Sequence, residues 1–328
     1  MALSSIWREN KILKRWIKKN YKDLIDGNYN YDMTNLLSDP LLEEIGKKLN
    51  VDKQYIYLGA GSSQLITSIL NLTIWNRIII TNTEFGLYTR IVENSKDNKI
   101  VIPCVSFDDF IRELEQIKSD KQDLLCFSSP RWLSGEIMTE TQFQKILKVY
   151  KGCILIDEAY ISFSSNPQGF LKNTLKNDRI ILLRSLSDKY FIPGLRVGYM
   201  ITKMKINGLR DTYIAPHSIS TFSARFMIKL LQDEKLVQLF EESIDYIKEI
   251  REVLLKEIKK DEDYRIVHSE ANFITLLFKS EKKGNQYFEI LKDLPGIQFY
   301  NKNKITFIKI WISNKIVTTE IIKRINAI

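Results

Sequence analysis

The stretch that decides the fold of this chain reads RSLSDKYFIPGLRVG, residues 184–198. It follows an apolar run at residues 180–183, which is typical of a buried parallel strand. Two small hydroxyls, a lysine and an arginine come after this strand's carboxyl end, where ligands bind in open α/β sheets. Hydroxyls and a guanidinium suit a phosphate, because they offer several donors and a bidentate fork. A strand followed by a basic surface loop is the alternative interpretation.

Strand-like and helical segments alternate on both sides of this stretch. Apolar runs expected as strands cover residues 77–81, 99–105, 123–127, 152–157, 179–183 and 197–201, with helices at 107–117 and 139–150. This alternation predicts right-handed βαβ units and one mostly parallel sheet with helices on both faces. The expected fold class is therefore α/β.

A second, smaller unit follows toward the C-terminus. Residues 218–260 have a long helical pattern with an expected bend near Asp233, and this helix would join the two units. The segments after it are expected as strands at 272–278, 298–300 and 305–311 and as helices at 282–291 and 317–327. We therefore predict an N-terminal arm (1–45), a large domain (46–220) and a small C-terminal α+β domain with its linking helix (221–328).

The composition favours a cytoplasmic globular protein and argues against several other classes. The net charge is +9, but the lysines are spread along the whole chain, so nucleic acid is not an expected partner. No apolar run of about twenty residues occurs and the start lacks a signal-peptide pattern, so no membrane association is expected. Cys104, Cys126 and Cys153 lie in apolar runs, as buried thiols in a reducing compartment do. His217 and His268 are too few for a zinc site.

Two further motifs place polar groups where a ligand would bind. Residues 59–66 read GAGSSQLI, and Gly61, Ser62 and Ser63 open a helix whose N–H groups and positive dipole end favour an anion. Such a turn is also common in proteins without a ligand. Residues 154–160 read ILIDEAY, so Asp157 ends a buried strand and needs a cationic or donor partner. A helix cap or an ion pair is the alternative role for this carboxylate.

Together these motifs resemble those of the class I/II, fold type I aminotransferases, and the resemblance runs from roughly residue 20 onward. It is strongest to the branch of histidinol-phosphate aminotransferase and threonine-phosphate decarboxylase. In that family Ser-x-Ser-Lys is followed by Gly-x-Arg-x-Gly. Here Ser185 and Ser187 match the serines, and Gly194, Arg196 and Gly198 match the second motif. The resemblance implies the aminotransferase fold and pyridoxal 5′-phosphate as cofactor.

The resemblance also implies a role for each matching residue. Asp157 would hold the protonated pyridine nitrogen, which makes the cofactor ring an electron sink. Tyr88 would stack on that ring, and Tyr160 would bond its phenolic oxygen; without a cofactor, Tyr88 is an amphipathic side chain at a helix start. The donors to the cofactor phosphate would be Gly61, Ser62, Ser63, Ser185, Ser187 and Arg196.

Several positions depart from the family pattern where the chemistry takes place. The family's Schiff-base lysine lies eight residues before the arginine, and position 188 here is Asp188, with Lys189 one residue later. Trp132 replaces an asparagine that bonds the phenolic oxygen, so this cofactor contact becomes an indole with one donor and no acceptor, which fills space near the substrate. Lys309 replaces the arginine that clamps the substrate carboxylate. Its ammonium is a point charge and cannot form the two parallel hydrogen bonds of a guanidinium. Asn28 loosely matches the loop that enters the substrate pocket.

Three functional hypotheses follow. In the first, the protein is a pyridoxal-phosphate-dependent, aminotransferase-like enzyme acting on an amino acid or an amino-acid-derived small molecule, with Lys189 turning in to form the Schiff base. In the second, it binds pyridoxal or pyridoxamine phosphate without a lysine Schiff base, and Asp188 moves a proton in dehydratase- or decarboxylase-type chemistry. In the third, it is a non-catalytic binding protein. We expect the first function, with Tyr160 as a further catalytic candidate, but Asp188 in the lysine's geometric position.

A homodimer is the expected assembly. The family's site is completed across a two-fold interface, and isologous dimers are the commonest closed assembly. Residues 4–25 form a basic amphipathic pattern that needs a surface to cover, either on the body of the chain or on a second subunit. Leu37 stands where the family usually has a tyrosine that reaches the neighbouring cofactor phosphate.

Overall fold

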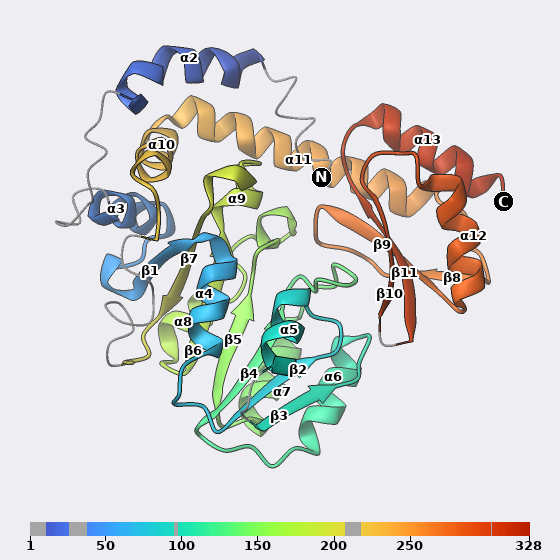
Figure 1. The fold of residues 1–328 in the computed structure, drawn as a ribbon, viewed down its shortest axis with the longest axis horizontal. Coiled ribbons are helices and arrows are strands. Elements are labelled where there is room, and N and C mark those ends of the chain that lie inside the picture. The colour runs from blue at the N-terminus through green and yellow to red at the C-terminus, as the bar shows by residue number, and fades with distance from the viewer. Residues whose placement is uncertain (1–10, 26–37, 95–97, 207–217, 303) are drawn as a thin grey trace.

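The computed structural model describes residues 11–25, 38–94, 98–206, 218–302 and 304–328. In these residues the helices are α2 (Lys11–Ile25), α3 (Ser38–Leu49), α4 (Gly61–Leu70), α5 (Gly86–Asn94), α6 (Phe107–Glu115), α7 (Glu140–Val149), α8 (Leu171–Lys176), α9 (Leu186–Lys189), α10 (Thr221–Gln232), α11 (Glu234–Glu257), α12 (Glu281–Leu291) and α13 (Lys315–Asn326). The strands are β1 (Ile56–Ala60), β2 (Arg77–Thr81), β3 (Asn98–Ile102), β4 (Asp123–Ser128), β5 (Cys153–Asp157), β6 (Ile180–Ser185), β7 (Val197–Thr202), β8 (Tyr264–Ile266), β9 (Phe273–Phe278), β10 (Ile297–Lys302) and β11 (Ile305–Trp311). Figure 1 shows a larger part and a smaller part, with α11 running between them.

A seven-stranded sheet forms the larger part, in the order β1-β7-β6-β5-β4-β2-β3. Strands β2 to β6 pair in parallel, whereas β7 pairs antiparallel with both β6 and β1. The predicted mostly parallel sheet is therefore confirmed. The pairing registers place Asp157 beside Ser128 and Ser185 beside Gly198, so the carboxyl ends of β4, β5 and β6 meet at one edge.

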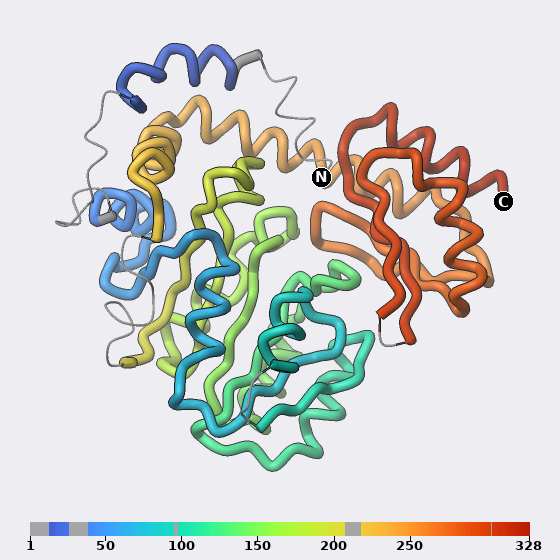
Figure 2. The backbone as a smooth tube through the Cα atoms, in the orientation of Figure 1, coloured from blue at the N-terminus to red at the C-terminus, as the bar shows by residue number. Residues whose placement is uncertain are grey.

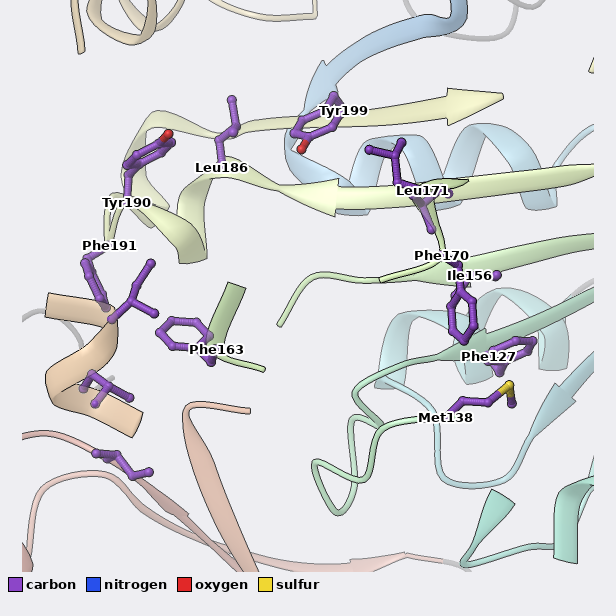
Figure 3. Close-up of a cluster of buried hydrophobic side chains, with 14 of the residues drawn as sticks. Phe127, Met138, Ile156, Phe163, Phe170, Leu171, Leu186, Tyr190, Phe191 and Tyr199 are labelled. Carbon is purple, nitrogen blue, oxygen red and sulfur yellow. The ribbon is translucent and has the colours of Figure 1, made fainter. Parts of the chain in front are cut away.

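The two faces of this sheet have separate hydrophobic cores, because successive side chains of a strand point to opposite faces. In β4, Leu124 and Cys126 belong to the core shared with α4 and α5. Leu125 and Phe127 belong to the larger core shared with α6 and α7. Figure 3 shows part of this larger core, where the Phe127 ring lies near the side chain of Met138. The helices on both faces agree with the predicted α/β architecture.

The two parts are joined by α10 and α11, with a break between them at Asp233. Its carboxylate accepts a hydrogen bond from the backbone N–H of Leu236 at 3.1 Å and so caps α11. The same carboxylate accepts from Nε1 of Trp16 at 2.8 Å, which holds α2 against this region. The bend predicted near Asp233 is confirmed. Figure 2 follows the backbone from the larger part through α11 into the smaller one.

The smaller part is built on a four-stranded antiparallel sheet, in the order β10-β11-β9-β8. Helix α12 packs on this sheet, and α13 packs against α11 and α12, which gives the predicted α+β unit. A small apolar cluster connects the two parts: Trp132 and Leu133 pack with Leu277 and Phe307. This junction lies beside the candidate site.

The cysteines and the helices can be compared with the expectation of buried thiols and of no membrane-spanning segment. Cys104, Cys126 and Cys153 are free thiols and all three are buried, as their apolar surroundings predict. None of the helices in the described part of the chain combines the length and the apolar character that crossing a bilayer requires.

Candidate active site

A cavity of about 150 Å³ lies at the carboxyl edge of the large sheet. Its walls come from the ends of β4, β5 and β6, from the start of α4 and from the loops around them. The lining residues are Ser62, Ser63, Phe85, Ser128, Trp132, Asp157, Ala159, Tyr160, Ser185, Asp188 and Arg196. Most of the residues that the sequence motifs singled out therefore meet in one place.

One end of the cavity is shaped for an anion. Gly61 has a φ of +74°, and a Cβ at this position would lie only 2.4 Å from Nη2 of Arg196. No side chain among the described residues caps α4, so the N–H groups of its first turn remain available. Arg196 itself has a φ of 51°, a conformation that residues other than glycine rarely adopt and that clusters at functional sites. Backbone donors and a guanidinium thus converge on the same small volume.

Asp157 ends β5 and is only 6% exposed. Its carboxylate accepts hydrogen bonds from the hydroxyl of Tyr88 at 3.1 Å and from the backbone N–H of Ala159 at 3.0 Å. Burial raises the pKa of Asp157 from 3.8 to about 7, and the negative charges of Glu84 and Asp188 add to this effect. A cationic nitrogen bound in the cavity would stabilise the ionised form of this carboxyl.

Asp188 lies in the short helix α9, directly after β6. The hydroxyl of Ser185 caps this helix by accepting from the backbone N–H of Asp188 at 3.4 Å. The carboxyl of Asp188 lines the cavity. Burial raises the pKa of Asp188, and this effect is opposed by the Ser185 hydroxyl and the charge of Arg196. An acidic group that can hold a proton is therefore present in the cavity wall.

Lys189 has different surroundings from Asp188. Its Nζ lies 5.4 Å from the centre of the Tyr190 ring, and Lys189 is not among the residues that line the cavity. Burial lowers the pKa of Lys189, while the carboxylate of Glu241 in α11 acts in the opposite direction. Successive helical residues point about 100° apart, so the two neighbouring side chains face different sides of α9. In the described part of the chain, no lysine lines the cavity.

Some residues predicted for the site lie elsewhere. Tyr88 is only 1% exposed, does not line the cavity and donates its hydroxyl hydrogen bond to Asp157. The aromatic residues of the lining are Phe85, Trp132 and Tyr160. Ser187 is buried, does not line the cavity, and its hydroxyl has no partner among the described residues. Lys309 is 0% exposed and also does not line the cavity, so its side chain does not face a ligand there. Asn28 lies outside the described residues.

The sequence motifs also missed three lining residues, Phe85, Ser128 and Ala159. Ser128 is the last residue of β4 and Ala159 follows β5 closely, so their positions after predicted strands were the available signal. Phe85 directly precedes α5, on the loop after β2, and is exposed. An exposed aromatic ring after a strand's carboxyl end is the sign that identifies it.

A family model, aminotransferase class I and II, matches residues 7–310 of this chain. The chain belongs to this family. Among aminotransferase relatives, a histidinol-phosphate aminotransferase of Clostridium novyi is 23% identical over 318 residues, covering 96% of this chain and 85% of that protein. A histidinol-phosphate aminotransferase of Thermoanaerobacter sp. strain X514 is 28% identical, covering 80% of this chain and 74% of its own length.

Solved aminotransferase-type structures have the same fold. The histidinol-phosphate aminotransferase from Clostridium acetobutylicum superposes with a TM-score of 0.77 at 22% identity and covers 95% of this chain and 94% of its own. The L-threonine-O-3-phosphate decarboxylase from Porphyromonas gingivalis superposes with a TM-score of 0.73 at 14% identity and covers 97% of this chain and 95% of its own. The predicted family and the predicted fold type I are therefore confirmed.

Pyridoxal 5′-phosphate is the cofactor of this aminotransferase family. The chemistry of the cavity fits this molecule in two respects. The uncapped α4 turn, with Gly61 and Arg196, supplies donors of the kind that a phosphate needs. Asp157 supplies a buried carboxyl whose partners among the described residues, the Tyr88 hydroxyl and the Ala159 N–H, are uncharged, so it suits a protonated ring nitrogen.

Proposed function

We propose that this family member binds pyridoxal 5′-phosphate in the cavity and acts on an amino-acid-derived amine without a lysine Schiff base. One observation carries the proposal: Asp188 lines the cavity and no lysine of the described residues does. The neighbouring Lys189 lies beside Tyr190 instead. Asp188 then takes the place in the reaction that the lysine has in other members of the family.

The lining residues divide into groups with different tasks. The proposed phosphate ligands are Ser62, Ser63, Ser185 and Arg196, together with the first N–H groups of α4. Asp157 would hold the ring nitrogen in its protonated form, and Phe85 would cover the ring. When bound, the cofactor supplies an electron sink for charge that develops on the substrate.

Two side chains are suited to hold or move a proton. Burial raises the pKa of Asp188, which brings this carboxyl closer to the range where a general acid or base works near neutral pH. Burial, with the charges of Asp188 and Asp157, raises the pKa of Tyr160 well above its ordinary value. The Tyr160 hydroxyl therefore stays protonated and acts as a hydrogen-bond donor in the cavity.

Reduction by borohydride tests this proposal. The purified protein is equilibrated with pyridoxal phosphate, freed of excess cofactor, reduced, and analysed by mass spectrometry of its peptides. We expect the wild type to bind the cofactor, with an absorbance band, but to carry no cofactor on Lys189 after reduction. Lys189→Ala should bind the cofactor as the wild type does, because Lys189 does not line the cavity.

The variant Asp188→Lys is the positive control, since it returns a lysine to the cavity wall. We expect this variant to carry the cofactor on residue 188 after reduction. Cofactor on Lys189 in the reduced wild type would refute the role of Asp188. A wild type that binds no pyridoxal phosphate would refute the proposed function as a whole.

A further inference from the structure

The charges around the cavity are unequal. Among the described residues of its lining, Arg196 is the single cation, and Asp157 and Asp188 are carboxyls. Arg196 lies against Gly61 at the α4 end, where the cofactor phosphate is proposed to bind. An anionic group on a second ligand would meet carboxyls in this lining and would find no further cation there.

Lys309 is close to the cavity but is separated from it by Trp132. It lies on β11, and its Nζ donates a hydrogen bond to the backbone carbonyl of Trp132. The same Nζ is 3.9 Å from the centre of the Trp132 indole and 4.1 Å from that of the Phe273 ring. Burial lowers the pKa of Lys309 well below its ordinary value. This amine is therefore enclosed by rings and a carbonyl on the far side of the wall.

Trp132 is held firmly in the wall. Its backbone N–H donates to the hydroxyl of Ser128 at 2.9 Å, and its indole packs edge-on against Tyr300 with ring centres 5.3 Å apart. The next residue, Leu133, is also fixed, because its carbonyl accepts from the hydroxyl of Thr275 at 2.6 Å. Contacts from both parts of the chain thus keep the indole between the cavity and Lys309.

We propose that the cavity selects amines that carry no anionic group, and that Trp132 sets this selection by holding Lys309 out of the cavity. The inference rests on the proposed function, since it concerns the amine that meets the bound cofactor. Among the described residues of the lining, a carboxylate or phosphate on that amine finds no cation besides Arg196 to replace its lost hydration. An uncharged alkyl group needs none and can pack against the Trp132 indole.

Removing the indole should reverse the preference. A lysine has a long, flexible stem, so its ammonium can enter a space that opens beside it. In Trp132→Ala the amine of Lys309 would lose the indole that separates it from the cavity, while the Phe273 ring remains beside it, and would gain access to the cavity. It would then supply the missing cation for a carboxylate or a phosphate.

Calorimetric titration of the cofactor-loaded wild type tests the selection directly. The matched ligands are propylamine, L-2-aminobutyrate, which adds a carboxylate, and 3-aminopropyl phosphate, which adds a phosphate. We expect propylamine to bind at least about tenfold more tightly than either anionic ligand. Equal or tighter binding of an anionic ligand would overturn the inference while leaving cofactor binding intact. Failure to load the cofactor would instead refute the proposed function, and the inference with it.

Three variants test the role of Trp132. In Trp132→Ala we expect L-2-aminobutyrate to bind at least about tenfold more tightly than in the wild type. The double variant with Lys309→Met should lose this gain. Lys302→Met is the matched control, because Lys302 is also near the indole, at 5.7 Å, but donates to the Glu84 carbonyl and the Thr89 hydroxyl. The Lys302→Met variant should keep the wild-type preference for propylamine. If the double variant Trp132→Ala/Lys309→Met still binds L-2-aminobutyrate more tightly than the wild type, the mechanism is refuted.

A measurement on the cofactor-free protein gives an independent readout. Acetic anhydride reacts with accessible, uncharged lysine amines, and mass spectrometry reports the extent of acetylation at Lys309. We expect Lys309 to react at least about tenfold faster in Trp132→Ala than in the wild type, because the indole covers it. If the alanine variant does not fold, Trp132→Leu takes its place. Equal rates in the folded variant and the wild type would overturn the assigned role of Trp132.

Discussion

The buried carboxyl of Asp157 should make the stability of the cofactor-free protein depend on pH, and Asp157→Asn should remove this dependence. Burial raises its pKa from 3.8 to about 7. Between these two pH values the folded protein keeps a proton on Asp157 that the unfolded chain releases. This stabilisation is complete below the unfolded pKa and is lost as the pH rises through the folded pKa. A difference of about three in pKa, at about 1.4 kcal/mol each, corresponds to a loss of about 4 kcal/mol.

Asparagine has nearly the same shape as aspartate but carries no charge at any of these pH values. Its side-chain oxygen can still accept one of the hydrogen bonds that Tyr88 and Ala159 donate to Asp157. At pH 8 we therefore expect Asp157→Asn to have a free energy of unfolding up to about 4 kcal/mol above that of the wild type. This advantage should shrink as the pH falls from 7 toward 3.8, and it should vanish only well below 3.8, where the wild-type carboxyl is protonated in both states.

Urea denaturation of the cofactor-free protein, followed by tryptophan fluorescence at pH 5, 6, 7 and 8, measures this difference. Midpoints are compared between variants whose transition slopes agree, because a changed slope reports a changed extent of unfolding. Asp245→Asn is the control: its carboxylate is 70% exposed and pairs with Lys248 on the surface, so the variant should follow the wild type. A stability difference between Asp157→Asn and the wild type that is the same at pH 5 and pH 8 would refute the reasoning.

Three other outcomes are expected. Arg196→Ala should weaken binding of pyridoxal phosphate by about 2 kcal/mol, roughly thirtyfold, through the loss of a charge-assisted contact; an unchanged absorbance titration contradicts this. Gly61→Ala should lower the stability by about 1–2 kcal/mol, because its φ of +74° is strained for alanine and its Cβ would meet Arg196. Urea midpoints check that cost, and unchanged midpoints argue against it. The protein should be a homodimer by light scattering at micromolar concentration, in keeping with the commonest closed assembly, and a monomer there would count against it.

Much of the large sheet could be predicted from local patterns. The strand β2 (Arg77–Thr81) has the predicted bounds, and the predicted ranges for β4 and β5 differ from the observed bounds by a residue. Strands that are buried on both faces have continuous apolar runs, and these are visible in a single sequence. The edge strand β1 (Ile56–Ala60) was not predicted, because Gly59 weakens its local pattern and its only pairing is with the distant β7.

The sequence also determined which residues gather at the cavity. Ser62, Asp157, Asp188 and Arg196 were predicted from motifs that are far apart along the chain, and the structure brings them into one lining. The physical reason is topological: parallel strands deliver their carboxyl ends to the same edge of the sheet, so residues that follow such strands become neighbours.

Only the tertiary structure decided which way the side chains point. Lys189 and Asp188 are neighbours in sequence, yet Asp188 lines the cavity and Lys189 does not, because α9 turns between them. Lys309 has its amine on the carbonyl of Trp132, which is 177 residues away in the chain. Hydrophobic periodicity reports which face of an element is buried, but contacts between distant segments select the rotamer of each polar side chain.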